Sequence, residues 1–123
     1  MATIKSYTDL EQSRKLAEIL PLESADMYYE PSTGYCTEPS EAKFGDIKYA
    51  HPRSIRCWSL AALLAVLPDE LEDNHFLTLD KEDNEYCCCY EDVNGNSFRH
   101  TFADNPIDAC VAMIEKLNEL NLL

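Results

Sequence analysis

The sequence has few basic residues, few glycines and no long hydrophobic run. It contains 10 Lys and Arg against 23 Asp and Glu, which gives a formal net charge of −13. Nucleic acids and anionic membranes attract clustered positive charge, so we expect neither direct nucleic-acid binding nor a membrane partner. No apolar stretch approaches the roughly 18 residues that cross a bilayer, and the first residues lack the apolar core of a secretion signal. We therefore expect a cytoplasmic location.

Several motifs that hold cofactors or metal ions are absent. The only glycines are Gly34, Gly45 and Gly95, and no G-x-G-x-x-G or G-x-x-x-x-G-K pattern is present to cradle a phosphate. No C-x-x-C pair or H-E-x-x-H spacing predicts a zinc site. The acidic run 80–85 lacks the central glycine of an EF-hand loop, and we interpret it as a solvated hairpin turn. The sequence thus predicts no cofactor and no metal ion.

Length and composition indicate a folded α+β protein. The chain has 123 residues, of which 46% are hydrophobic, and this is enough for one core. We predict a single domain over 1–123. It is expected to contain an antiparallel sheet, made of a three-stranded meander plus one or two short strands, packed against about three helices.

Three segments carry helix signals. The first begins with a capping box over Thr8–Glu11 and ends before Pro21. The second is the apolar segment 57–67, which is rich in Leu and Ala. The third begins at Asn105, a favourable N-cap that is followed by proline. We expect the second and third helices to cover the aromatic face of the meander.

Short apolar and aromatic stretches between turn residues predict the strands. Short strands are expected at 25–30 and 47–50, separated by a loop at 31–45. An acidic connector is expected at 69–74. The meander strands are then expected at 75–80, 85–91 and 97–103.

The turn over Asp92–Gly95 sets the register that we predict for the last two strands. A type I turn with its glycine in a left-handed bulge places Tyr90 opposite Phe98. Strict alternation from there sets Cys88 opposite His100. One face is then expected to hold Tyr86, Cys88, Tyr90, Phe98, His100 and Phe102, and the other Cys87, Cys89, Glu91, Ser97, Arg99 and Thr101.

The six cysteines are interpreted as free thiols, because the sequence shows no sign of export. Cys87 and Cys89 share one strand face and could bind a metal ion, but such a site needs two more ligands. The predicted register puts His100 on the opposite face. We therefore interpret the two thiols as half-buried strand positions.

Cys57 is the candidate nucleophile. At the start of a helix its thiol would be exposed to the helix dipole and to Arg56, and both favour the thiolate. A Cys-Trp helix start followed by His100 on a strand, with Asp104 near it, resembles the order of elements in papain-like cysteine peptidases. The glycine- and cysteine-rich residues that precede the nucleophile of those enzymes are missing. The sequence therefore favours a non-enzymatic role and keeps Cys57, His100 and Asp104 as an alternative catalytic set.

Aromatic residues and arginine gather in the first half of the chain. Tyrosine, tryptophan and arginine are the residue types that most often anchor protein interfaces, although each of these aromatic residues also suits the core. We take them as candidate contacts for an unidentified protein partner and leave homodimerisation open. The candidates are Tyr28, Tyr29, Tyr49, Arg53 and Trp58.

Part of the chain resembles a known group of proteins. The resemblance lies in three segments, TDLEQSRKLAEILPLESADMYY (8–29), CWSLAALLAVLP (57–68) and ADNPIDACVAMIEKLNELNLL (103–123). They are similar to a family of small uncharacterised proteins encoded by gut bacteria and by their phages and mobile elements. The family has no assigned activity, so the resemblance implies a cytoplasmic, phage- or mobile-element-derived protein and assigns no residue roles.

These observations lead to one functional prediction and two alternatives. The leading prediction is a small cytoplasmic protein-interaction module. The first alternative is a cysteine hydrolase that uses Cys57 and His100. The second is an acidic decoy for a basic, nucleic-acid-binding partner, because a surface of such negative charge can attract a basic protein.

Overall fold

The computed structural model describes residues 5–30, 42–45, 52–72 and 74–123. Within them lie three α-helices and two antiparallel sheets, so the predicted α+β class is confirmed. The chain divides into two compact units, each described by itself. The first unit is Ser6–Ala62, and the second is Leu63–Leu123 together with the described part of Met1–Lys5. That 1–123 form a single domain stays a prediction.

Helix α1 spans Leu10–Ile19 and has a different cap from the predicted one. The N-cap is Asp9, whose carboxylate accepts a hydrogen bond from the Gln12 N–H at 2.8 Å, and the Gln12 side chain accepts one from the Asp9 N–H at 3.1 Å. The capping box expected at Thr8 is wrong because Thr8 is fully buried. Its hydroxyl accepts a hydrogen bond from the N–H of Trp58 at 3.1 Å, so it serves the core instead.

The sheet of the first unit has three short strands in the order β2-β1-β3. Strand β1 (Met27–Tyr29) lies inside the predicted strand 25–30 and pairs antiparallel with both neighbours. Strand β2 (Ala42–Phe44) lies where a loop was predicted, and β3 (Ile55–Cys57) lies partly in the predicted helix 57–67. Both segments are too short to show alternation by themselves, and pairing with β1 holds them extended. The strand expected at 47–50 lies outside the described residues.

Helix α2 spans only Leu60–Val66. A short 3-10 turn, η1 (Leu22–Ser24), lies earlier in the chain, between α1 and β1. The Ser59 N–H donates to the Asp26 carboxylate at 3.0 Å, and the Ser59 hydroxyl accepts from the Ala62 N–H at 3.2 Å. These bonds cap the first turn at Ser59. The predicted helix start at Cys57 is therefore wrong, because that residue is paired with Met27 in the sheet.

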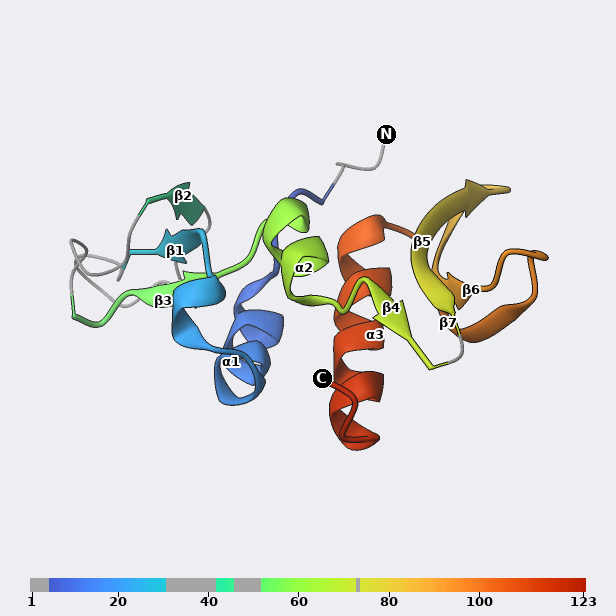
Figure 1. Ribbon diagram of the computed structural model, residues 1–123. Coiled ribbons are helices and arrows are strands. Elements are labelled where there is room, and N and C mark those ends of the chain that lie inside the picture. Colours follow the sequence, from blue (N-terminus) through green and yellow to red (C-terminus); the bar gives the residue numbers. More distant parts are fainter. Residues whose placement is uncertain (1–4, 31–41, 46–51, 73) are drawn as a thin grey trace. The chain divides into compact units, whose positions relative to one another are not determined.

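The second unit contains the predicted meander. Its sheet has the order β4-β5-β6-β7 (Figure 1). The last three strands have close to the expected bounds. A two-residue strand, β4, extends the sheet within the segment predicted as an acidic connector. The strands are β4 (Glu70–Leu71), β5 (His75–Glu82), β6 (Glu85–Glu91) and β7 (Ser97–Ala103).

Helix α3 (Pro106–Glu119) covers one face of this sheet, and we call that face the inner face (Figure 1). The Asn105 side chain accepts a hydrogen bond from the Asp108 N–H at 2.8 Å, as expected for an N-cap. The Thr101 hydroxyl of β7 donates to the Ala109 carbonyl of the helix at 2.7 Å. The buried stripe of the helix contains Ile107, Cys110, Val111, Ile114 and Leu117.

Both hairpins turn as the sequence indicates. Asp83 and Asn84, with φ of 51° and 62°, form the two-residue connection between β5 and β6, so the acidic run is a hairpin turn. Gly95 has a φ of 82°, and its N–H donates to the Asp92 carbonyl at 3.0 Å. The predicted pairing of Tyr90 with Phe98 is confirmed.

A bulge at Arg99 changes the register beyond that pair. Arg99 has a φ of 51°, and the pairing shifts by one residue, so that Cys89 and not Cys88 lies opposite His100. The predicted face of His100 is therefore wrong, and Phe102 has moved with it. The inner face carries Tyr86, Cys88, Tyr90, Phe98, Thr101 and Ala103, and the outer face carries Cys87, Cys89, Glu91, Ser97, His100 and Phe102.

Candidate functional site

The outer face of the β5–β6–β7 sheet contains a hollow with a volume of about 460 Å³. Five carboxylates, two thiols, one hydroxyl, one imidazole and one phenyl ring lie around it. We call it the outer-face hollow. Its lining residues are Asp80, Glu82, Asp83, Glu85, Cys87, Cys89, Glu91, Ser97, His100 and Phe102.

Strand alternation explains how these side chains meet. Every second residue of β6, from Glu85 to Glu91, points to the outer face, and Asp80 of β5 lies opposite Cys87. Without the bulge, Thr101 would lie on this face in place of His100. One extra residue in β7 therefore brings an imidazole to the same side as two thiols.

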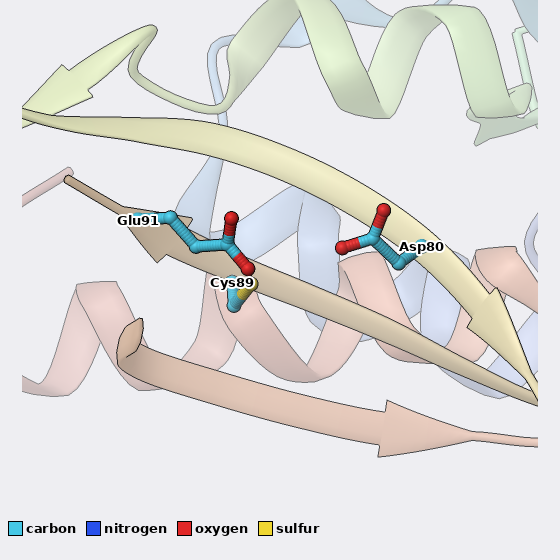
Figure 2. A group of neighbouring side chains, drawn as sticks. All are labelled: Asp80, Cys89 and Glu91. Carbon is cyan, nitrogen blue, oxygen red and sulfur yellow. Dashed lines mark hydrogen bonds between the residues drawn. The ribbon is translucent and has the colours of Figure 1, made fainter. Parts of the chain in front are cut away.

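Three of the lining residues form a cluster of potential metal ligands. One ligand atom each from Asp80, Cys89 and Glu91 lies within 4.8 Å of the others, and their side chains point toward one another (Figure 2). The Cys89 thiol donates to the Glu91 carboxylate at 3.6 Å and lies 2.9 Å from the Thr78 hydroxyl. Cys89 is 1% exposed, so its sulfur is held at the floor of the hollow.

The charged groups that line the hollow are all acidic. Within the described residues, no Lys or Arg forms an ion pair with any of its five carboxylates. Burial, and then the charge of Glu91, raises the pKa of the Cys89 thiol, although hydrogen bonds with Thr78 and Cys87 act in the opposite direction. Burial and the neighbouring Cys89 raise the pKa of Cys87 to about 11. Both thiols therefore hold their protons at neutral pH.

A second pair of thiols lies on the other side of the sheet. Cys88 of β6 and Cys110 of α3 are fully buried and in contact through their side chains. The hydrogen bond to Cys110 and burial raise the pKa of Cys88. This pair belongs to the neutral core between sheet and helix, away from the outer-face hollow.

Cys57 occupies a buried position that does not favour a thiolate. It ends β3, is fully buried, and donates a hydrogen bond to the Thr8 carbonyl at 3.3 Å. Tyr29 donates to the same carbonyl at 2.7 Å. Burial raises the pKa of the Cys57 thiol, although hydrogen bonds from Thr8 and Ser13 oppose that effect. The lowered pKa expected from a helix dipole is therefore wrong.

The other two members of the alternative catalytic set are exposed. His100 lies on the outer face beside Phe102, with the ring centroids 5.4 Å apart. The prediction that His100 lies in the core is therefore wrong. Asp104 lies between β7 and α3. Both belong to the second unit and Cys57 to the first. A joint catalytic role for the three residues stays a prediction.

The candidate interface residues of the first half lie in different surroundings. Trp58 is fully buried, and its Nε1 donates to the Ser24 hydroxyl at 2.9 Å. Tyr29 is also in the core, whereas Tyr28 is half-buried and Arg53 is exposed. Tyr49 lies outside the described residues.

The sequence did contain a signal for the outer-face hollow. Glu85, Cys87, Cys89 and Glu91 alternate along one strand, so four polar or metal-ligating groups share one face. Asp80 could have been added by counting back across a two-residue turn at Asp83. The position of His100 had no comparable signal, because the bulge that moves it has no glycine.

No family model, curated protein or solved structure matches this chain. Among the described residues, the helices are too short or too polar to cross a lipid bilayer. The functional argument therefore depends on the geometry of the outer-face hollow.

Proposed function

We propose that this protein is a small cytoplasmic interaction module whose outer-face hollow binds a basic segment of a partner protein. The observation that carries the proposal is the row of five carboxylates around one hollow. The resemblance described above supports a phage or mobile-element setting for the interaction.

Charge complementarity is the first argument. The five carboxylates come from Asp80, Glu82, Asp83, Glu85 and Glu91, and no Lys or Arg among the described residues neutralises them through an ion pair. Like charges that are gathered on one surface repel one another, and a bound cationic segment relieves that repulsion. The formal net charge of −13 extends the attraction beyond the hollow.

Exposed aromatic rings on the same face are the second argument. Phe102 lines the hollow and is 56% exposed, and Phe76 of β5, opposite Glu91, is 42% exposed. Lysine and arginine have long apolar stems, and their charged ends bind to the faces of aromatic rings. Carboxylates beside phenyl rings therefore suit basic side chains better than neutral peptides.

The acidic decoy is a particular case of this proposal, in which the basic segment is the nucleic-acid-binding surface of the partner. The carboxylates gather at the β5–β6 hairpin and along one face of β6. A basic segment in either setting would meet the same hollow. A competition assay separates the decoy from the general interaction module. Duplex DNA should compete with this protein for the partner only if the protein is a decoy, because only then do both bind the same basic surface.

The test uses a fluorescent peptide rich in lysine and arginine, with its glutamine-substituted counterpart as the ligand control. Glu82→Gln/Glu85→Gln should weaken binding by roughly 5- to 30-fold, since each exposed charge pair contributes about 0.5–1 kcal/mol. Glu18→Gln/Glu119→Gln removes the same charge from two exposed positions outside the hollow and should change the affinity by less than about 2-fold. Equal weakening by both variants would show that the peptide follows net charge and would overturn the proposal.

A further inference from the structure

The Asp80, Cys89 and Glu91 cluster is a mixed donor set and not an acidic patch. Its three ligand atoms lie within 4.8 Å of one another, and they come from two neighbouring strands (Figure 2). Ligand atoms around a tetrahedral zinc ion are about 3.3–3.8 Å apart. The sulfur of Cys89 is already 3.6 Å from the Glu91 oxygen. Small side-chain rotations of Asp80 and Glu91 would bring all three atoms to metal-binding distance.

The surroundings of the cluster supply further donors. Cys87 and His100 line the same hollow, and the two thiols interact through their side chains. His100 is the residue that lies directly opposite Cys89 in the sheet. A side chain of the hollow or a water molecule would fill the fourth position. The hollow thus contains sulfur, oxygen and nitrogen donors, most of them on paired strands.

We propose that the outer-face hollow binds a Zn²⁺ ion through the Cys89 thiolate and the carboxylates of Asp80 and Glu91. On binding, the Cys89 thiol loses its proton to solvent and a sulfur–zinc bond forms. The ion also offsets the repulsion between two carboxylates that no Lys or Arg among the described residues neutralises.

The donor chemistry selects the class of metal. Mg²⁺ and Ca²⁺ bind oxygen ligands almost exclusively, so a thiol at the floor of the hollow disfavours them. Zn²⁺ accepts sulfur, nitrogen and oxygen together and adopts the four-coordinate geometry that two strands can supply. Three protein ligands and a fourth position open to water would leave the ion able to take a further ligand.

Zinc binding is independent of the proposed interaction function, although both use one hollow. A bound Zn²⁺ together with the Cys89 thiolate would lower the net negative charge of the hollow by one and should weaken binding of the basic peptide. Cys89→Ser removes the metal ligand without changing the charge of the hollow at neutral pH, so it should leave peptide binding intact. Glu82→Gln/Glu85→Gln should weaken binding of the basic peptide and leave the metal bound. The two proposals can therefore fail separately.

The experiment is a Co²⁺ titration of the reduced full chain without a polyhistidine tag, followed by displacement with Zn²⁺. The native protein should show the near-ultraviolet absorption of a sulfur–cobalt bond and the intense visible bands of a four-coordinate ion. Cys89→Ser should lose the sulfur band, and Asp80→Asn should weaken binding by at least about 10-fold. Glu82→Gln, in the same hollow but outside the cluster, is the matched control and should bind as the native chain does.

Two further measurements keep the test decisive. If Cys89→Ser does not fold, Asp80→Asn still tests the site, because Asp80 is exposed and its loss costs no core packing. Zn²⁺ should also raise the midpoint of thermal unfolding of the native chain but not of Asp80→Asn. A sulfur band that survives Cys89→Ser, or weak six-coordinate spectra from the native protein, would overturn the assignment.

Discussion

Cys87, Cys88 and Cys89 are adjacent in sequence and lie in two different environments. Cys88 points to the inner face, where α3 covers it and its neighbour is the Cys110 thiol. Cys87 and Cys89 point to the outer face, where carboxylates surround them. The three residues have the same chemistry, so the difference comes from strand alternation and from what lies above each face. The inner thiol serves packing, and the two outer thiols line the hollow.

The two faces also differ in how they contribute to stability. The inner face buries aromatic and aliphatic groups against a helix, and this burial is the main stabilising term in folding. The outer face leaves Phe102 half-exposed and gathers like charges, which favours a ligand over stability. Substitutions on the inner face should therefore change folding, and substitutions on the outer face should change binding.

The largest expected effect is the truncation of a core aromatic residue. Tyr90→Ala should destabilise the protein by about 3–5 kcal/mol, because Tyr90 is fully buried and its hydroxyl donates to the Pro68 carbonyl at 2.7 Å. Phe102→Ala, the matched change on the outer face, should cost less than about 1 kcal/mol. Urea unfolding of both variants measures the difference. Equal losses would mean that the two faces are not distinguished by burial.

The bulge gives the next largest effect. Arg99→Val should cost about 1–2 kcal/mol, because a β-branched residue is strained at a φ of 51°. Arg99→Asn is the control, since asparagine tolerates that conformation while it loses the same contacts with the Phe98 ring and Glu72. Urea unfolding should therefore find the asparagine variant the more stable one. The opposite order would argue against a left-handed residue at this position.

Thiol reactivity compares the two faces under native conditions. Iodoacetamide should modify Cys87 at least about 100-fold faster than Cys88 or Cys110, because the inner thiols react only after the structure opens. Since the pKa of Cys87 is raised to about 11, its rate should rise about tenfold per pH unit up to that value. Mass spectrometry of timed samples gives the rates. Fastest labelling of Cys57 would instead support the cysteine-hydrolase alternative.

The smallest effect is a pH dependence of stability. The Cys87 thiol has a pKa of about 11 in the folded chain against an ordinary value of 9.0, so the folded state holds the proton more tightly. Its contribution is complete below about pH 9 and is lost as the pH rises through about 11. Cys87→Ser should show a shallower alkaline loss in urea unfolding. Parallel curves for the two proteins would contradict the raised pKa.

Local signals predicted the second unit better than the first. The turn residues Asp83 and Gly95, together with an N-cap at Asn105, fix the hairpins and α3, and each signal lies within a few residues of what it determines. Strand β3 and the burial of Thr8 depend on pairing with distant segments. Such pairings leave no mark in a window of neighbouring residues, so a helix start was predicted at a strand end.

One part of the outer-face hollow followed from local sequence signals, and the other part did not. Alternation along β6 puts Cys87, Cys89 and Glu91 on one face, and that part of the prediction is confirmed. The side of His100 depends on one extra residue in β7, where Arg99 adopts a conformation that usually needs glycine. No sequence rule places a bulge at an arginine, so the imidazole was expected in the core and the ligand set looked incomplete.

Disulfide trapping tests the register most directly. In His100→Cys/Cys87→Ser/Cys88→Ala/Cys110→Ala, Cys89 remains opposite the new thiol at position 100. In His100→Cys/Cys87→Ser/Cys89→Ala/Cys110→Ala, Cys88 remains instead. Removing Cys110 from both variants prevents its own cross-link with Cys88, which it contacts in the core. Directly paired strand residues fall within the Cα separations of about 4.4–6.8 Å that a disulfide spans, and side chains on opposite faces do not meet. After mild oxidation and cleavage at Arg99, mass spectrometry should find the cross-linked peptides only in the variant that keeps Cys89. A cross-link through Cys88 would return His100 to the inner face and contradict the account.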